Sequence, residues 1–283
     1  MADESLQHRL RVLTFNLLAM HQADGGRRQI IVERGLRELR PDVVAFQEVL
    51  RTAAHDQVRD LLGPDYHVVD HPRASPDGIG ACLATRFPVG ATQEIELRVT
   101  SAAADLPWSA AVVAEVHAPA PVGPLLVVHH KPSWQYGREY EREQQALATA
   151  RSVERLVAGR DLPVVLLGDF DAAPDAASVR FWTGRQSLAG TSVCYQDAWE
   201  AVHPEVPGHT FSPRNRLVRD GEMPLERGRR IDYVMVRCGP HGPPLEVTRC
   251  DLVFADEVDG VWASDHFGVF AELQVPVTRP GGP

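Results

Sequence analysis

The sequence predicts an α/β domain in which two β-sheets pack face to face and helices cover the outside. Strands outnumber helices along the chain, and helical segments fall between strands in both halves. A helix, a proline, a buried strand and a terminal carboxylate also follow one another twice, ending at Glu48 and at Asp169. This weak internal repeat suggests two similar halves whose strand ends meet. It would bring Glu48 close to Asp169 and Asp171.

In the first half of the chain, apolar and polar residues alternate in short runs, and turns separate these runs. The expected strands are 9–18, 41–48, 66–69, 80–85, 92–99 and 110–117. The expected helices are 27–39 and 52–62. Residues 119–124 are too short and too apolar for a domain linker, so we expect a turn between the two halves there.

The second half repeats the pattern with longer apolar runs. The expected strands are 125–130, 162–167, 230–237, 245–254 and 266–275, and the expected helices are 139–157, 175–182 and 196–202. A Pro-, Gly- and Arg-rich loop covers 204–229. We expect one domain over 9–275, with flexible tails at 1–8 and 276–283.

Composition narrows the class of protein. The chain has 283 residues, ordinary apolar and charged fractions, and a formal net charge of −9. A chain of this sign is not built to hold a long polyanion by bulk electrostatics, although local basic patches could do so. Its four cysteines form no CxxC pair, which makes a zinc knuckle unlikely. A polar N-terminus and the lack of a long apolar run lead us to expect a cytoplasmic protein without a membrane span.

Asp169 and Asp171 directly follow the strongly apolar stretch 162–167. Side chains two positions apart on an extended chain point to the same side. Two adjacent anions repel unless a cation or a shared proton holds them. An Asp-rich turn before the helix after Pro174 explains the same residues, and spacing alone does not separate the two interpretations.

Further polar residues stand at the ends of apolar strands: Asn16, Glu48, His130, Asp232, Asp265 and His266. Each alone has a structural explanation, such as a turn cap, an ion pair with a nearby arginine, or a core histidine. Their number favours a metal site, because buried unpaired acids are costly. Carboxylates and an amide suit Mg²⁺ or Mn²⁺, and such a site points to in-line hydrolysis of a phosphoester by water.

Six motifs, taken together, resemble the endonuclease/exonuclease/phosphatase superfamily, which includes deoxyribonuclease-type endonucleases and neutral sphingomyelinases. They are Thr14-Phe-Asn16, Gln47-Glu48, the strand end at His130 with Arg142 and Gln145, Gly168-Asp-Phe-Asp171, Arg230-Ile-Asp-Tyr233 and Ser264-Asp-His266. The resemblance runs from about residue 10 to 273. It implies a four-layer α/β sandwich with the site at one end.

The resemblance also implies a role for each site residue. Glu48 would be the main metal ligand, with Asn16 and Asp265 beside it. Asp169 would position or deprotonate the attacking water. His266 would be a second base or phosphate ligand.

The remaining roles concern the phosphate. Asp232 would hold His266, and His130 would stabilise charge on the phosphoryl oxygens. Apart from the resemblance, Lys131, the only lysine of the chain, and Arg230, at the end of a basic loop, are further candidates to bind phosphate. A solvated loop balanced by nearby acids explains the arginines equally well, and a surface position explains Lys131.

One departure from the family pattern affects the site directly. The family commonly has Asn where Asp171 stands. An ionised Asp cannot donate a hydrogen bond to phosphate, so Asp171 is protonated, binds a metal or has another role. We favour added metal-binding capacity.

The substrate class is not fixed by the fold. Our first hypothesis is a divalent-metal phosphodiesterase that hydrolyses a small or lipid-derived phosphodiester. The alternatives are an endonuclease or exonuclease acting on DNA or RNA, and a non-catalytic binding protein on the same fold. The sequence leaves the number of metals and the oligomeric state open.

Overall fold

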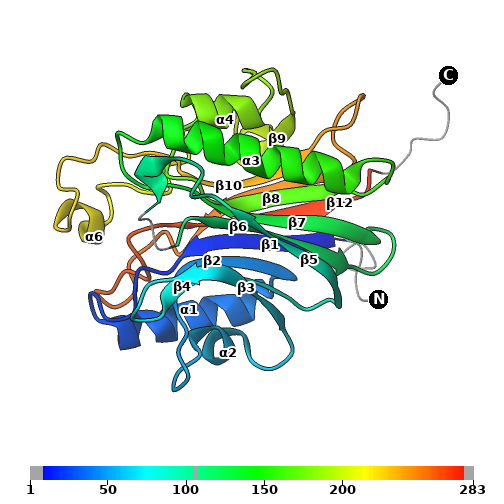
Figure 1. Cartoon of the computed structure of the whole chain (residues 1–283). Coiled ribbons are helices and arrows are strands. Elements are labelled where there is room, and N and C mark those ends of the chain that lie inside the picture. The colour runs from blue at the N-terminus through cyan, green and yellow to red at the C-terminus, as the bar shows by residue number, and fades with distance from the viewer. Residues whose placement is uncertain (1–8, 105–107, 277–283) are drawn as a thin grey trace.

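The computed structural model describes residues 9–104 and 108–276, and these form four layers (Figure 1). Two mixed sheets of six strands make the inner layers. In spatial order the first sheet contains β11 (Glu246–Val253), β12 (Gly268–Gln274), β1 (Arg9–Asn16), β2 (Val43–Leu50), β4 (Ile79–Thr85) and β3 (His67–Ala74). The second contains β5 (Val89–Glu96), β6 (Ala110–His117), β7 (Pro124–Lys131), β8 (Val164–Asp169), β10 (Asp232–Arg237) and β9 (Tyr195–Asp197).

Helices form the outer layers. Figure 1 shows α1 (Gly25–Leu39) and α2 (Gln57–Leu62) beside the first sheet, and α3 (Glu139–Val157) and α4 (Ala177–Trp182) beside the second. α5 (Ala198–Val202) contributes Trp199 to the core between the sheets. The short α6 (Arg216–Arg219) extends beyond the sheet ends on a long loop. These layers confirm the predicted fold class.

The two parallel strand pairs confirm the internal repeat. β1 pairs with β2 through α1, and β7 pairs with β8 through α3. Parallel neighbours need such a crossover connection. The carboxyl ends of these four strands therefore lie at one end of the sandwich.

The two core clusters to which the residues of β7 belong show which of its side chains face the other sheet. Leu125 and Val127 belong to the core between the sheets, whereas Leu126 and Val128 pack beneath α3. Since successive side chains of a strand point to opposite faces, Lys131 continues the inner row. His130 continues the outer row.

The structure differs from the expected elements in several places. The helix expected at 52–62 begins only at Gln57, the strand expected at 92–99 lies at 89–96, and the loop expected at 204–229 contains α6. Residues 196 and 197 were expected to begin a helix, but they belong to β9 because they pair with β10. The strand expected at 66–69 continues to Ala74 as β3. The expected flexible tails fall almost entirely outside the described residues. Among the described residues, no helix is both long enough and apolar enough to cross a membrane.

Candidate active site

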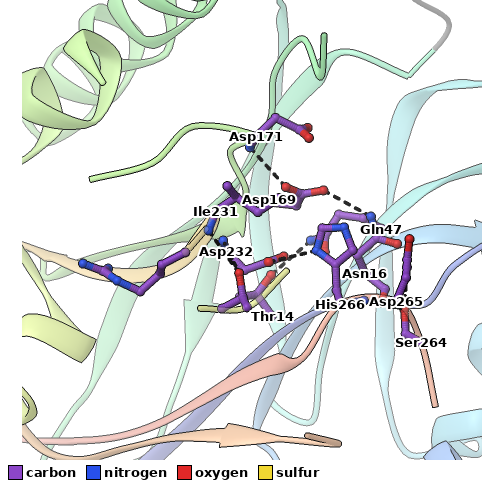
Figure 2. A network of polar contacts seen from close by, with 12 residues as sticks. Thr14, Asn16, Gln47, Asp169, Asp171, Ile231, Asp232, Ser264, Asp265 and His266 are labelled. Carbon is purple, nitrogen blue, oxygen red and sulfur yellow. Dashed lines mark hydrogen bonds and ion pairs between the residues drawn. The ribbon is translucent and has the colours of Figure 1, made fainter. Parts of the chain in front are cut away.

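Asn16 joins the two sheets at the end where the strands meet (Figure 2). Its Nδ2 donates to Glu48 Oε1 and to Asp169 Oδ2, each at 3.1 Å. Its Oδ1 accepts the backbone N–H of Leu18 at 3.0 Å, which fixes the orientation of the amide. Glu48 and Asp169 therefore lie close together, as predicted, because one amide donates to both carboxylates.

Glu48 reaches the site because the backbone of β2 is irregular there. The register with β4 shifts between Gln47 and Val49, and Glu48 has φ 56. A bulge of this kind redirects a side chain. Gln47 points into the core between the sheets, where it contacts Thr14 and His129. Glu48 instead lines the cavity, and its Oε2 accepts the N–H of Ala19 at 3.1 Å.

Glu48 and Asp265 form the group that best fits a divalent cation. Both carboxylates line one cavity. Burial raises the pKa of Asp265, and the charge of Glu48 adds to this effect while His266 opposes it. A bound cation would relieve the repulsion between the two acids. Their oxygens make a hard donor set. Asn16, predicted to be a ligand as well, turns Nδ2 to Glu48 and Oδ1 to the Leu18 N–H, so it orients the acid and adds no oxygen to the set.

A second set of ligand atoms, from Asp169, Asp232 and His266, lies within 4.8 Å of one another. It suits a metal less well, because His266 Nδ1 already contacts Asp232 Oδ2 at 2.9 Å. Burial opposes protonation of His266, but Asp232 and Asp169 together raise its pKa well above the ordinary value. An imidazolium donates hydrogen bonds and has no lone pair for a metal.

Asp169, Asp171 and Lys131 form a buried ionic triad. Lys131 Nζ lies 2.8 Å from Asp169 Oδ2 and also contacts Asp171 Oδ2. Burial alone would raise the pKa of Asp169, but the Lys131 charge lowers it to about 2, so Asp169 is an ionised acceptor. Burial and the Asp169 charge raise the pKa of Asp171 to about 6. The triad keeps an ammonium group inside the site.

A cavity of ≈ 700 Å³ opens over these residues. The long loop predicted at 204–229 forms one wall through Phe211, Arg216 and Met223. Trp108 and Trp134 line the cavity as well. Its walls therefore combine aromatic surface with the charged groups of the strand ends.

Two residues predicted to bind phosphate do not fit their positions. His130 is buried on the outer face of β7, where Nδ1 lies 3.2 Å from Thr149 Oγ1 and the ring packs edge-on against Phe170 and Trp182. Burial lowers the pKa of His130 to about 3, so it is a neutral core histidine. Lys131 lines the cavity instead.

Arg230 is the second of these residues. It is 5% exposed and pairs with Asp197 beneath the site, and its guanidinium lies 4.9 Å from the centre of the Tyr233 ring. Arg229, one position earlier, lines the cavity. Lys131, which was also predicted to bind phosphate, and Arg229, which was not singled out, therefore have the better positions.

Arg28 is a structural residue that the sequence did not reveal. It is 3% exposed, and its guanidinium donates to six backbone carbonyls. Five lie in the loop that follows β1 (Leu17, Leu18, Ala19, Gln22 and Ala23), and the sixth is that of Ala263. An Arg in a polar helical segment looks like a solvent-exposed residue, so no sequence signal pointed to it.

Comparisons with known proteins agree with this geometry. The family model described as "Endonuclease/Exonuclease/phosphatase family" matches residues 13–266. Similar solved structures include D. rerio TDP2 complexed with single strand DNA product, at 20% identity and TM-score 0.72, covering 94% of this chain and 99% of that one. The human Nocturnin catalytic domain with bound sulfate anion is similar at 19% identity and TM-score 0.72, covering 95% and 94%.

A bacterial structure is similar to the same extent. The Bacteroides vulgatus endonuclease/exonuclease/phosphatase has 22% identity and TM-score 0.70, covering 95% of this chain and 99% of that one. Among curated proteins, none matches the chain. The solved structures support the fold, and the family model spans nearly the whole chain. The chain belongs to the endonuclease/exonuclease/phosphatase family of metal-dependent phosphoesterases.

Proposed function

We propose that the chain is a divalent-metal-dependent phosphodiesterase that hydrolyses a small or lipid-derived phosphodiester by in-line attack of water. The charge of the residues that line the cavity is the observation that supports this substrate class. Its described lining has three Lys or Arg residues (Lys131, Arg216 and Arg229) but seven carboxylates: Glu48, Asp77, Asp169, Asp171, Asp220, Glu222 and Asp265. A long polyanion would be repelled by this surface, whereas a single phosphodiester can be held at its centre.

The metal site in this proposal consists of Glu48 and Asp265, with Asn16 orienting Glu48 through Nδ2. Mg²⁺ or Mn²⁺ suits these oxygen donors, and the bound ion would neutralise charge on the phosphoryl oxygens. The hydrogen bonds from Asn16 and Ala19 fix the orientation of the Glu48 carboxylate. Burial lowers the pKa of the Arg28 guanidinium, and the charges of Asp265 and Glu48 oppose this effect, so Arg28 partly compensates the charge of these two acids.

The remaining residues act on the proton and the phosphate. Asp169 is ionised and fixed by Asn16 and Lys131, so it can accept a hydrogen bond from the attacking water and orient it. His266 is held protonated by Asp232, so it can donate to a phosphoryl or leaving oxygen. Lys131 adds a second donor to the phosphoryl group.

The cavity size and its aromatic walls suit a compact substrate. A volume of ≈ 700 Å³ is in the range of sites that enclose a small ligand. Trp108 and Trp134 offer apolar surface for the group esterified to the phosphate. The second candidate is a nuclease acting on single-stranded nucleic acid, favoured by Arg216 and Arg229 at the wall and by the DNA product in the similar TDP2 structure.

The test compares substrates under the same metal conditions. Purified protein is assayed in Mg²⁺, in Mn²⁺ and in chelator with bis(p-nitrophenyl) phosphate, phosphatidylcholine vesicles and a single-stranded DNA oligonucleotide. We expect metal-dependent hydrolysis of a small or lipid diester with a higher kcat/KM than for the oligonucleotide. The reverse order would favour the nuclease.

The variant Glu48→Gln links the activity to the site. It keeps the shape of the side chain but removes a full negative charge from the metal site, so kcat/KM should fall by a factor of about 10² or more. Glu38→Gln is the matched control, because Glu38 is exposed on α1, away from the cavity. Full activity in Glu48→Gln would refute the metal site.

A further inference from the structure

Lys131 is the only lysine of the chain, and it is buried at the candidate site. Its side chain is 4% exposed, yet it lines the cavity. A buried ammonium is costly unless it is paired, and here Asp169 and Asp171 both contact Nζ. One carboxylate would be enough to balance the charge of the ammonium group, so the second contact needs another explanation.

The two contacts also fix the direction of the ammonium group. A lysine side chain is flexible and carries three N–H donors. Asp169 and Asp171 occupy two of them, which leaves the third donor for a group in the cavity. Asp169 is itself fixed by Asn16, so Asp171 is the contact that determines how the ammonium turns.

Asp171 is held in place by an unusual local backbone. It has φ 52, in the left-handed region, and its own N–H donates to Asp169 Oδ1 at 3.1 Å. Asp and Asn tolerate this conformation better than other non-glycine residues. Asn would keep the turn but would remove the negative charge that faces Lys131.

We propose that Asp171 is a positioning residue that acts through Lys131, holding its ammonium against a non-bridging oxygen of the phosphoryl group. This inference rests on the proposed function. It explains why Asp stands where the family pattern has Asn, because the Lys131–Asp171 pair supplies the donor that the amide would otherwise offer. It replaces our expectation that Asp171 adds metal-binding capacity, since Lys131 already occupies Oδ2.

A double-mutant cycle separates these two roles. In the wild-type background, Asp171→Asn should lower kcat/KM for bis(p-nitrophenyl) phosphate about tenfold without changing the Mg²⁺ concentration for half activity. In the Lys131→Met background, the same change should alter kcat/KM by less than about twofold. Asp175→Asn is the matched control, because Asp175 is exposed on the same loop and outside the cavity.

Either of two results would overturn the inference. One is an undiminished effect of Asp171→Asn in the Lys131→Met background, which would mean that Asp171 acts without Lys131. The other is a higher Mg²⁺ requirement in Asp171→Asn, which would make Asp171 a metal ligand. Circular dichroism and thermal unfolding of each variant identify any loss that comes from misfolding.

A binding experiment keeps the inference testable without turnover. Protein labelled with ¹³C only at Cε of lysine gives a single side-chain carbon signal, because Lys131 is the only lysine. Titration with inorganic phosphate in Mg²⁺ should shift this signal, with an affinity at least about threefold weaker in Asp171→Asn. Equal affinities would refute the positioning role. If no diester is hydrolysed but this difference appears, the proposed function fails and the positioning role stands.

An independent observation concerns Cys194 and Cys238, which face each other where β9 and β10 pair. The antiparallel register places Tyr195 opposite Arg237, so the two cysteines are the next partners, and Cys238 N–H donates to Cys194 O at 2.8 Å. Partners in an antiparallel sheet are within disulfide reach. Cys194 is exposed and Cys238 half-buried, and both are free thiols.

We infer that this pair is a site of disulfide formation under hydrogen peroxide. The Cys194 sulfur attacks the peroxide and becomes a sulfenic acid with release of one water. The Cys238 sulfur then displaces the second water and closes the bond, so two thiols are oxidised and one peroxide is reduced to two waters. The bond would close the base of the 194–238 segment, which carries Arg216 and Arg229 of the cavity wall.

Peptide mapping without reductant tests this inference. Treatment with hydrogen peroxide should cross-link the peptides of Cys194 and Cys238 and raise the thermal midpoint by about 5–10 °C. Cys194→Ser should abolish both effects, and Cys250→Ser should leave the cross-link intact, because Cys250 is buried on β11 in the other sheet. Irreversibly oxidised Cys194 without a cross-link would overturn the inference.

Discussion

Replacing Arg28 with Met should destabilise the protein and weaken the candidate metal site. The guanidinium makes five hydrogen bonds of 2.6–3.1 Å and one of 3.4 Å to backbone carbonyls. Met fills a similar volume but donates none of them. The carbonyls of Leu17 and Leu18 would then lie buried without a partner or would draw water into the loop.

The magnitude follows from these contacts. Hydrogen bonds to a charged group contribute about 1.5–3 kcal/mol each, so the five short bonds set an upper bound of about 7–15 kcal/mol. The loop can relax, and burial of the guanidinium itself was costly, so the net loss should be smaller. We expect a decrease of about 3–5 kcal/mol in the free energy of unfolding, typical of removing one partner from a buried charged network.

The loop also carries a direct link to the metal site. The N–H of Ala19 donates to Glu48 Oε2, and the carbonyl of Ala19 accepts from Arg28. Loosening this loop should therefore raise the metal concentration needed for half activity. Arg28→Lys should be intermediate in stability, because an ammonium has three donors where the guanidinium satisfies six acceptors.

Urea unfolding followed by tryptophan fluorescence measures the loss. Arg27→Met is the matched control, because the Arg27 side chain is 59% exposed and its described partners are the exposed Asp24 and the carbonyl of Asp259. It should cost less than about 1 kcal/mol. If Arg28→Met loses no more than this control and keeps its metal requirement, the hydrogen bonds of Arg28 do not organise the loop, and our reasoning is wrong.

Three further predictions test the site and the core. Gly168→Ala should lower the free energy of unfolding in urea by about 3 kcal/mol or more, because Gly168 has φ 151 and an added Cβ would lie 2.1 Å from His130 O. The control Gly159→Ala, at φ 73 with open space around it, should lower it by only about 1 kcal/mol. The pKa of His130 is about 3 in the folded protein and near 6.5 in the unfolded chain, so the neutral form stabilises the fold above pH 6.5, and this stability is lost as the pH falls towards 3. Between pH 6.5 and 4.5 the free energy of unfolding of His130→Phe should therefore fall by about 2–3 kcal/mol less than that of the wild type. An equal fall in the two proteins would contradict this. Asp232→Asn should lower kcat about 10²-fold with little change in KM, because the His266 imidazolium loses the carboxylate that holds it; steady-state kinetics that show a changed KM alone would argue against this role.

The fold and the composition of the site could be predicted because both follow from local rules. The apolar run 164–167 is short and bounded by Pro163 and Gly168, which favours a buried strand, and helices between such strands favour an α/β sandwich. The internal repeat, in which a helix, a proline, a buried strand and an acid follow one another twice, predicted that the strand ends of the two halves meet. Glu48 and Asp169 do lie close together, because the Asn16 amide contacts both.

The sequence does not determine which face of a strand each residue occupies. His130 and Lys131 are neighbours, and either could face the cavity, because an all-apolar strand gives no polar alternation to set the phase. The core residues of the other sheet set it, through contacts that sequence spacing does not reveal. The same one-residue ambiguity separates Arg229, which lines the cavity, from Arg230, which pairs with Asp197.

The backbone at the site is a second feature that strand periodicity cannot predict. Glu48 and Asp171 both have positive φ, and both follow the regular part of a buried strand. With regular strand geometry, Glu48 would point away from the face that Gln47 occupies, and the cavity would lose its central carboxylate. The bulge at Glu48 turns its side chain to the cavity, and the hydrogen bond from Asp171 N to Asp169 Oδ1 holds the backbone turn at Asp171. Strained conformations of non-glycine residues persist where surrounding contacts enforce them, and here those contacts come from Ala19, Asn16 and Lys131, the groups that orient the candidate catalytic acids.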